Sequence, residues 1–274
     1  IVNGLVGSEM CIRDRSYRDD GYQIVFLAKN KLGYENLMKM CSIGYTEGFY
    51  YVPRIDKDLV KKYKEGLIVL SGSKYGEISN KIINVGEKQA LDACIWWKEN
   101  FMNDFYLEMN IHGEEENEII NEQLFKFSKN HDIKLIATND TKYISREDAN
   151  AHDILLCVKD GQQQSTPIGR GRGFRYGLKN QEYYFKTKDE MIKLFKKYPD
   201  AIGNISELVE KVDFYDLSRE VLLPKFSIPE NFNSISNDIE NEYLKHLVYE
   251  GASEKYENIN DGLKEKIDFE LEVI

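Results

Sequence analysis

Short apolar runs that alternate with amphipathic segments are the feature that most limits what the first part of this chain can fold into. The apolar runs lie at residues 23–27, 67–70, 105–109 and 134–138. Their length and near-continuous apolar character are typical of strands that are buried on both faces. Segments of helical length follow them at residues 34–45, 87–101, 115–129 and 146–158. This alternation predicts an α/β fold with a parallel sheet covered by helices, either open or as part of a barrel.

Polar residues follow three of the predicted strands. These segments are Ser71–Ser73, Asn110–Gly113 and Asn139–Lys142. In folds built on parallel strands, binding and catalysis take place at the carboxyl ends of the strands. The sequence therefore predicts that any site in this region lies where these three segments meet.

The pattern changes beyond Asp160. Residues 161–180 are rich in glycine and polar side chains, and a further strand is predicted at residues 183–185. Helices are predicted at residues 188–198, 200–211, 238–256 and 262–274. Prolines at both ends of residues 224–229 predict an extended connector, because the residue before a proline disfavours helix. The last helix has no capping signal at its end, so we expect an artificial end there.

The segment at residues 169–177 is basic and interleaves glycine with arginine and aromatic residues. It holds Arg170, Arg172 and Arg175 and no acidic residue. Glycines allow close approach of the backbone and arginines bind phosphates with two hydrogen bonds, so contact with a DNA backbone is one interpretation. Contact with an acidic neighbouring domain and a mobile, soluble loop are the alternatives. No GKS or GKT follows, which excludes a Walker loop.

Composition limits the classes of function. The chain has 37 basic and 47 acidic residues and a net charge of −10, which is a poor basis for tight, autonomous binding of nucleic acid. Its four cysteines have no CxxC spacing and predict a reduced, cytoplasmic protein. No apolar run is long enough to cross a bilayer, so no membrane partner is expected.

The beginning of the chain does not match the rest. Residues 5–15 resemble a translated sequencing adapter. We therefore expect residues 1–15 to be a disordered artefact, and the native sequence to be cut at this point.

Several stretches, in matching order and spacing, resemble the PHP domain of the bacterial DNA polymerase III alpha subunit. They are residues 24–30, 33–37, 47–56, 65–72, 105–108, 137–140, 147–157, 223–226 and 269–274. The resemblance implies a distorted (βα)7 barrel that lacks its first strands. It also implies that residues 16–222 are the later portion of the PHP domain, and that residues 223–274 are a connector and the first helices of the polymerase region.

For function, the resemblance implies a fragment of a replicative DNA polymerase. The parent would add deoxynucleoside triphosphates to a DNA primer with Mg²⁺, and its catalytic aspartates would lie downstream of Ile274, leaving the fragment alone inactive. The proofreading subunit and other replisome subunits are the implied partners. A metal-dependent PHP phosphoesterase or 3′–5′ exonuclease is one alternative function, and a non-catalytic scaffold or interaction module is the other.

Active PHP domains hold divalent metals with clustered His, Asp, Glu and Cys side chains, which activate water and stabilise a leaving phosphate oxygen. The resemblance places four of the family's ligand positions in this chain. They are Gln23, Ser73, Asp140 and Lys142. Three of the four are poor ligands, and a lysine ammonium opposes cation binding and could pair with Asp140. We therefore predict a metal-free, structural PHP domain, in which Glu108 and His112 make structural hydrogen bonds.

Overall fold

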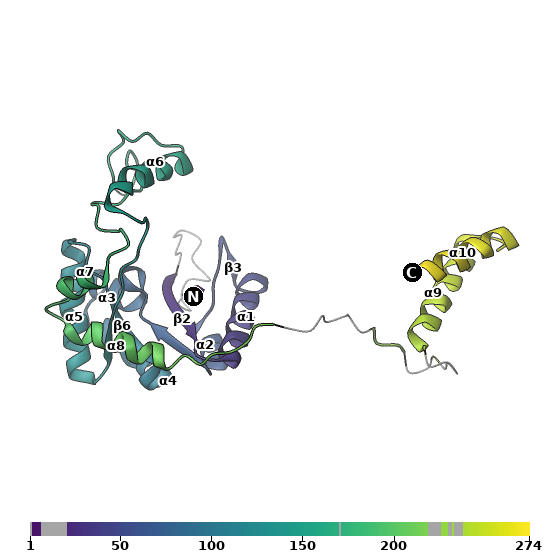
Figure 1. Cartoon of the computed structure of the whole chain (residues 1–274), viewed down its shortest axis with the longest axis horizontal. Helices are drawn as coiled ribbons and strands as arrows, with labels where there is room; N and C mark the ends of the chain where they lie inside the picture. Colours follow the sequence, from purple (N-terminus) through teal and green to yellow (C-terminus); the bar gives the residue numbers. More distant parts are fainter. Residues whose placement is uncertain (1, 7–20, 170, 219–225, 230–231, 233–237) are drawn as a thin grey trace. The chain divides into compact units, whose positions relative to one another are not determined.

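The computed structural model describes residues 2–6, 21–169, 171–218, 226–229, 232 and 238–274 (Figure 1). The chain divides into two compact units, Ile1–Leu217 and Ser218–Ile274. The boundary predicted between residues 222 and 223, the start of the connector, and Arg170 lie outside the described residues. Each unit is described by itself.

The sheet of the first unit has the strand order β1-β2-β5-β6-β7 in the described part of the chain. Its strands are β1 Val2–Val6, β2 Tyr22–Ala28, β5 Leu67–Leu70, β6 Phe105–Met109 and β7 Lys134–Ala137. Strands β5, β6 and β7 run parallel, as the alternation predicts. Strand β2 runs antiparallel to β5, so the prediction of a wholly parallel sheet is wrong.

The connection between β2 and β5 explains this reversal. It contains two helices, α1 Lys31–Thr46 and α2 Lys57–Tyr63, joined by a hairpin of β3 Phe49–Tyr50 and β4 Val52–Pro53. A single crossover helix would return the chain to the start of β2 and make the next strand parallel. A second helix brings it back to the end of β2 instead, where the Lys29 N–H donates to the Gly66 carbonyl at 2.8 Å.

The first strand is a further correction. Residues 2–6 were expected to be disordered, but they form β1 and pair antiparallel with β2, with Val2 opposite Phe26 and Val6 opposite Tyr22. The rest of the predicted adapter segment, residues 7–15, lies outside the described residues.

Helices cover both faces of the sheet in the first unit. Besides α1 and α2, the helices in the described part of this unit are α3 Glu77–Asn84, α4 Glu87–Phe101, α5 Glu115–His131, α6 Ala149–Asp160, which stands apart from the sheet (Figure 1), α7 Lys188–Leu194 and α8 Pro199–Glu210. Side chains of α1, α3, α4 and α5 pack on one face, and Leu208 of α8 packs on the other. The strands alternate between these two clusters, since Phe105 and Leu107 join the first and Tyr106 joins the second.

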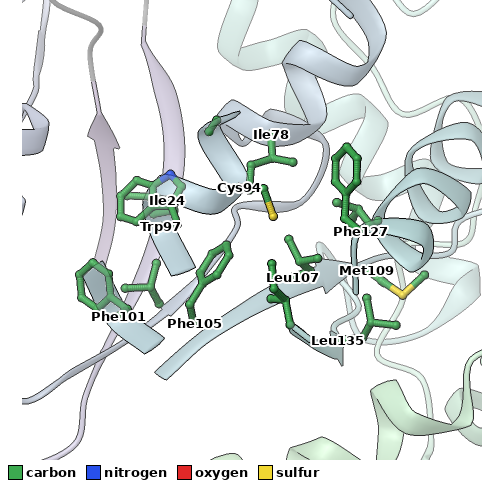
Figure 2. Packing of buried hydrophobic residues seen from close by; sticks show 14 of the residues in the cluster. Ile24, Ile78, Cys94, Trp97, Phe101, Phe105, Leu107, Met109, Phe127 and Leu135 are labelled. Carbon is green, nitrogen blue, oxygen red and sulfur yellow. The ribbon is translucent and has the colours of Figure 1, made fainter. Parts of the chain in front are cut away.

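The larger cluster is centred on aromatic rings. Trp97 is 1% exposed, and its ring lies 5.8 Å from that of Phe101 and 6.4 Å from those of Phe26 and Phe105. Figure 2 shows Trp97, Phe101 and Phe105 beside aliphatic residues of the strands, among them Leu107. Trp97 is therefore a core residue, as its helical spacing predicts.

The strand predicted at residues 183–185 does not form. This segment lies along residues 142–144, where the Lys142 N–H donates to the Tyr183 carbonyl at 2.8 Å. The only bridge between these two segments joins Tyr143 and Tyr184. Because residues 142–144 are themselves a loop, they offer no strand edge along which a longer ladder could grow.

The second unit contains two helices in its described part, α9 Ile239–Lys255 and α10 Asp261–Val273. Asn260 caps α10 by accepting a hydrogen bond from the Leu263 N–H at 2.9 Å, and Tyr249 donates to Asp268 at 2.6 Å. In the parts of the chain with assigned positions, no helix has the length and apolar character needed to cross a membrane.

Candidate functional site at the carboxyl edge of the sheet

The ends of β5, β6 and β7 meet at one edge, as the sequence predicts. The Ser71 hydroxyl accepts a hydrogen bond from the Glu108 N–H at 2.9 Å, and the Thr138 N–H donates to the Met109 carbonyl at 3.0 Å. The turn after β5 approaches β2 closely at Gly72, where a Cβ atom would lie 2.1 Å from the Gln23 carbonyl oxygen. The edge thus joins four strands through backbone and side-chain contacts.

Glu108 lies at the centre of this edge and is buried. Its carboxylate accepts hydrogen bonds from the Gly72 N–H at 3.1 Å and from the Thr138 hydroxyl at 2.6 Å. Asn110 donates in turn to the Thr138 hydroxyl oxygen at 2.6 Å. Burial raises the pKa of Glu108, and the charge of Asp140 raises it further, against the opposing effect of these donors. These contacts support the predicted structural role.

The raised pKa predicts how stability depends on pH. A carboxyl group whose folded pKa lies above its unfolded value stabilises the fold at low pH, and this contribution is lost as pH rises through the folded pKa. We expect the Glu108→Gln variant to lack this loss, so its stability relative to the wild type should increase from acidic to neutral pH. Urea unfolding of both proteins across this range measures the difference. A difference in stability between the two proteins that stays constant across this pH range would contradict the raised pKa of Glu108.

His112 and Tyr183 form the second part of the edge. Their rings stack 4.1 Å apart and nearly parallel, and His112 Nε2 lies 2.8 Å from the Asn139 carbonyl oxygen. Asn180 donates to the His112 carbonyl at 2.6 Å. Burial lowers the pKa of His112, so the neutral ring is favoured. His112 is therefore held by packing and hydrogen bonds, again consistent with the predicted structural role.

Tyr183 connects this stack to an ion pair. Its hydroxyl donates to Glu114 at 2.6 Å and accepts from Lys74 Nζ at 3.1 Å, while Lys74 Nζ lies 3.5 Å from Glu114. Burial raises the pKa of Glu114, but the Tyr183 hydrogen bond and the Lys74 charge outweigh it and leave the pKa lowered. Burial, followed by the Glu114 contact, raises the pKa of Tyr183. The tyrosine therefore stays neutral and donates to an ionised Glu114.

The four positions expected from the resemblance do not form one cluster of ligands. Gln23 is exposed on β2, and Ser73 follows the Gly72 turn with φ 51°. Asp140 has φ 42°, and its carboxylate is 2.6 Å from Lys142 Nζ. Among these four described residues, Asp140 and Lys142 are joined by a side-chain contact, which is the ion pair that the sequence suggested.

This donor set does not fit a divalent metal. Lys142 holds the Asp140 carboxylate, and the Glu108 carboxylate is already engaged by Gly72 and Thr138. A cation would have to displace an ammonium group and would gain a single carboxylate, whereas metal sites combine three or more such ligands. Within the described ranges, no group of three or more His, Cys, Asp or Glu residues could hold a metal ion.

Comparison with known proteins shows which sequences this chain is similar to. The model of the PHP domain matches residues 2–112. The DNA polymerase III subunit alpha of Borreliella burgdorferi is 40% identical over 92% of the chain and 21% of the relative. That of Treponema pallidum is 30% identical over 100% of the chain and 23% of the relative. The chain is homologous to part of the DNA polymerase III alpha subunit. It spans about one fifth of the length of these curated relatives.

The homology to the polymerase family reaches beyond the matched PHP segment. The match to the PHP model ends at residue 112, but the relatives continue through the Asp140 loop and the Tyr183 segment. Both halves of the carboxyl edge therefore lie in sequence that is shared with the polymerase subunits. The resemblance identified from short stretches is confirmed by this coverage.

The family resemblance did not reveal several residues that build the edge. Lys186 is buried, donates to Asn139 Oδ1 at 3.2 Å, and has a pKa that burial lowers. The sequence also did not predict that Lys74, Glu114 and Tyr183 belong to this edge. Each has an unremarkable sequence context, and their partners lie far along the chain. The one available signal was the position of Lys74 directly after the polar end of a strand.

The basic segment differs from its sequence interpretation at one residue. Arg175 is buried, and its guanidinium binds Asp153 of α6 through two contacts of 2.6 and 2.9 Å. Its Nε also donates to the Thr166 carbonyl at 2.9 Å. Arg175 therefore holds the loop on α6, and it is poorly placed to contact phosphate. Arg172 is exposed, and Figure 1 shows α6 and its following loop standing apart from the sheet.

Proposed function

We propose that this chain is part of a replicative DNA polymerase whose complete protein carries out template-directed DNA synthesis. The support is homology over 92–100% of the chain to subunits of that name. The substrates of the complete protein would be DNA and deoxynucleoside triphosphates, its polymerase metal would be Mg²⁺, and its location would be the cytoplasm. We assign nucleotidyl transfer to the portion of the relatives that this chain does not span. The proofreading subunit and other replisome subunits are the proposed partners.

Within that protein, we propose that the carboxyl edge is a metal-free structural centre. The observation that carries this proposal is the 2.6 Å contact between Lys142 Nζ and the Asp140 carboxylate. The ammonium supplies a positive charge at a family ligand position, so the carboxylate is neutralised without a metal. Glu108 then joins the ends of β5, β6 and β7 by hydrogen bonds. His112 ties them to residues 180–186 through its stack on Tyr183 and its hydrogen bond with Asn180.

The finer fold proposal is a distorted (βα)7 barrel. Three parallel strands with most of the helices on one face and α8 on the other are compatible with such a barrel. The smaller cluster on the opposite face, which includes Ile68, Tyr106 and Ile136, would then line its interior.

Metal analysis of the full-length polymerase subunit tests the structural centre. The protein is purified without chelators, and zinc, manganese and iron are measured per chain by mass spectrometry. We expect far less than one ion per chain, and we expect a chelator to leave the unfolding temperature unchanged. The matched variant Lys142→Met, which removes the ammonium and leaves Asp140 unpaired, should lower that temperature. Stoichiometric metal that is lost together with stability on chelation would overturn the proposal.

A metal-dependent phosphoesterase or 3′–5′ exonuclease is the second candidate function. Glu108, His112 and Asp140 lie at or just after the carboxyl ends of β6 and β7, where the chemistry of such enzymes takes place, which is the observation in its favour. This second candidate function requires that the protein shows a nuclease activity that depends on added Mn²⁺ and is abolished by Asp140→Asn. A non-catalytic scaffold requires neither activity nor metal.

The basic segment remains a proposal for contact with phosphate, now centred on Arg172, with Arg170 outside the described residues and Arg175 bound to Asp153. An exposed arginine among glycines can approach a DNA backbone, and its contribution would decrease with salt.

A further inference from the structure

Four large aromatic side chains are exposed around the β3–β4 hairpin, and we call them the aromatic face. Tyr45, Phe49, Tyr50 and Tyr51 expose 65, 57, 45 and 65% of their surface. The rings of Tyr45 and Phe49 stack with centroids 6.4 Å apart, and those of Tyr50 and Tyr51 meet edge to face at 4.8 Å. Contiguous exposed apolar patches of this kind mark interaction surfaces on soluble proteins.

The backbone holds these rings in a defined position. Tyr51 has φ 62°, a left-handed conformation that is rare for a bulky residue and strained without support. The hairpin packs against the end of α1, where a Cβ atom on Gly48 would lie 2.0 Å from the Arg54 carbonyl oxygen. The Arg54 N–H also donates to the Gly48 carbonyl at 3.2 Å. The aromatic face is therefore presented by a closely packed hairpin beside α1 (Figure 1).

The segment that carries the aromatic face is basic, in contrast to the whole chain. Residues 29–64 hold eight lysine or arginine residues and four acidic residues, whereas the chain has a net charge of −10. The Arg54 guanidinium lies 4.7 Å from the centre of the Tyr50 ring. Lys39 of α1 and Lys62 of α2 lie 5.9 and 5.2 Å from the ring of Tyr63. Arg54 thus places a positive charge beside an exposed ring of the aromatic face, and α1 and α2 carry further lysines.

We propose that the aromatic face and its basic flank bind single-stranded nucleic acid. Base faces stack on aromatic side chains with little dependence on sequence, and lysine and arginine bind the phosphates between them. Within residues 43–55, each exposed large hydrophobic side chain is aromatic, and a guanidinium lies beside one of the rings, which is a combination that can stack bases and bind phosphate. The proposal goes beyond the proposed function, because it uses different elements from the carboxyl edge and does not depend on its metal content.

Photocrosslinking locates the contact directly. The full-length subunit and this chain are each irradiated with an oligothymidylate that carries 5-iododeoxyuridine, and the linked residues are identified by mass spectrometry. We expect crosslinks at Phe49, Tyr50 or Tyr51 that decrease with added salt. The double variant Phe49→Ala, Tyr51→Gly should weaken binding of the oligonucleotide by this chain about tenfold, from the usual effect of losing stacked rings. Glycine retains the left-handed backbone at residue 51.

The control variant is Phe214→Ala, which removes a ring that is 99% exposed elsewhere in the first unit. Its affinity and crosslinks should match those of the wild type, and circular dichroism should show all variants folded. Absence of crosslinks to the aromatic face in both proteins would overturn the inference. So would stronger protection of the hairpin amides from hydrogen exchange in the full-length subunit without DNA than in this chain, because that result assigns the face to a protein contact. Primer extension, measured separately, distinguishes either outcome from failure of the proposed polymerase function.

Discussion

The Trp97→Ala variant is expected to lower the free energy of unfolding of the first unit by about 3–5 kcal/mol. Trp97 is almost fully buried, and it contacts Phe26, Phe101 and Phe105. Truncation removes this packing and leaves a cavity between α4 and the sheet. It also deprives the buried Glu77 carboxylate of the indole N–H donor at 3.1 Å. The expected loss is a large share of the stability of an ordinary domain.

Trp96→Ala is the matched control, since it removes the same side chain from the neighbouring position. Trp96 is half-buried, and Lys57 and Lys61 lie 4.6 and 5.6 Å from its ring. Loss of these cation–π contacts and of partial burial should cost about 1–2 kcal/mol. Urea unfolding of the three proteins gives the comparison. Equal losses in the two variants would contradict the assignment of Trp97 to the core.

The Gly72→Ala variant should have the second largest effect, with a loss of about 2–5 kcal/mol from backbone strain and overpacking. Gly72 has φ 85°, and an added Cβ would lie 2.1 Å from the Gln23 carbonyl oxygen. The contact is with backbone, so β2 and the turn after β5 would have to separate. That movement would also weaken the hydrogen bond from the Gly72 N–H to Glu108.

Variants at two other glycines distinguish backbone strain from overpacking as the cause of this loss. Gly161 has φ 61° and open space around its Cβ position, so Gly161→Ala should lose only the backbone term of about 1–2 kcal/mol. Gly203 lies within α8 with open space, so Gly203→Ala should be neutral or stabilising by up to about 1 kcal/mol. Thermal and urea unfolding measure all three. If Gly72→Ala loses no more stability than Gly161→Ala, overpacking against the Gln23 carbonyl does not contribute to the loss.

Much of the candidate site could be predicted where its parts are close in sequence or repeat a local pattern. The ends of β5, β6 and β7 follow apolar runs, and their convergence follows from the parallel order. The ion pair of Asp140 and Lys142 could be predicted because the two residues are close in sequence. The stack of Tyr183 on His112 was not, because nothing in either local sequence specifies a partner so far along the chain.

By itself the sequence determined the bounds of several central elements. The bounds of β5, α4 and β6 agree with the predicted runs, because strand burial and helical periodicity both appear as patterns among residues that are close in sequence. The tertiary structure alone decided the direction of β2, the burial of Arg175 on Asp153 and the network around Tyr183. Each of these depends on how connections fold back and which distant groups then meet, and local patterns carry no information on such contacts.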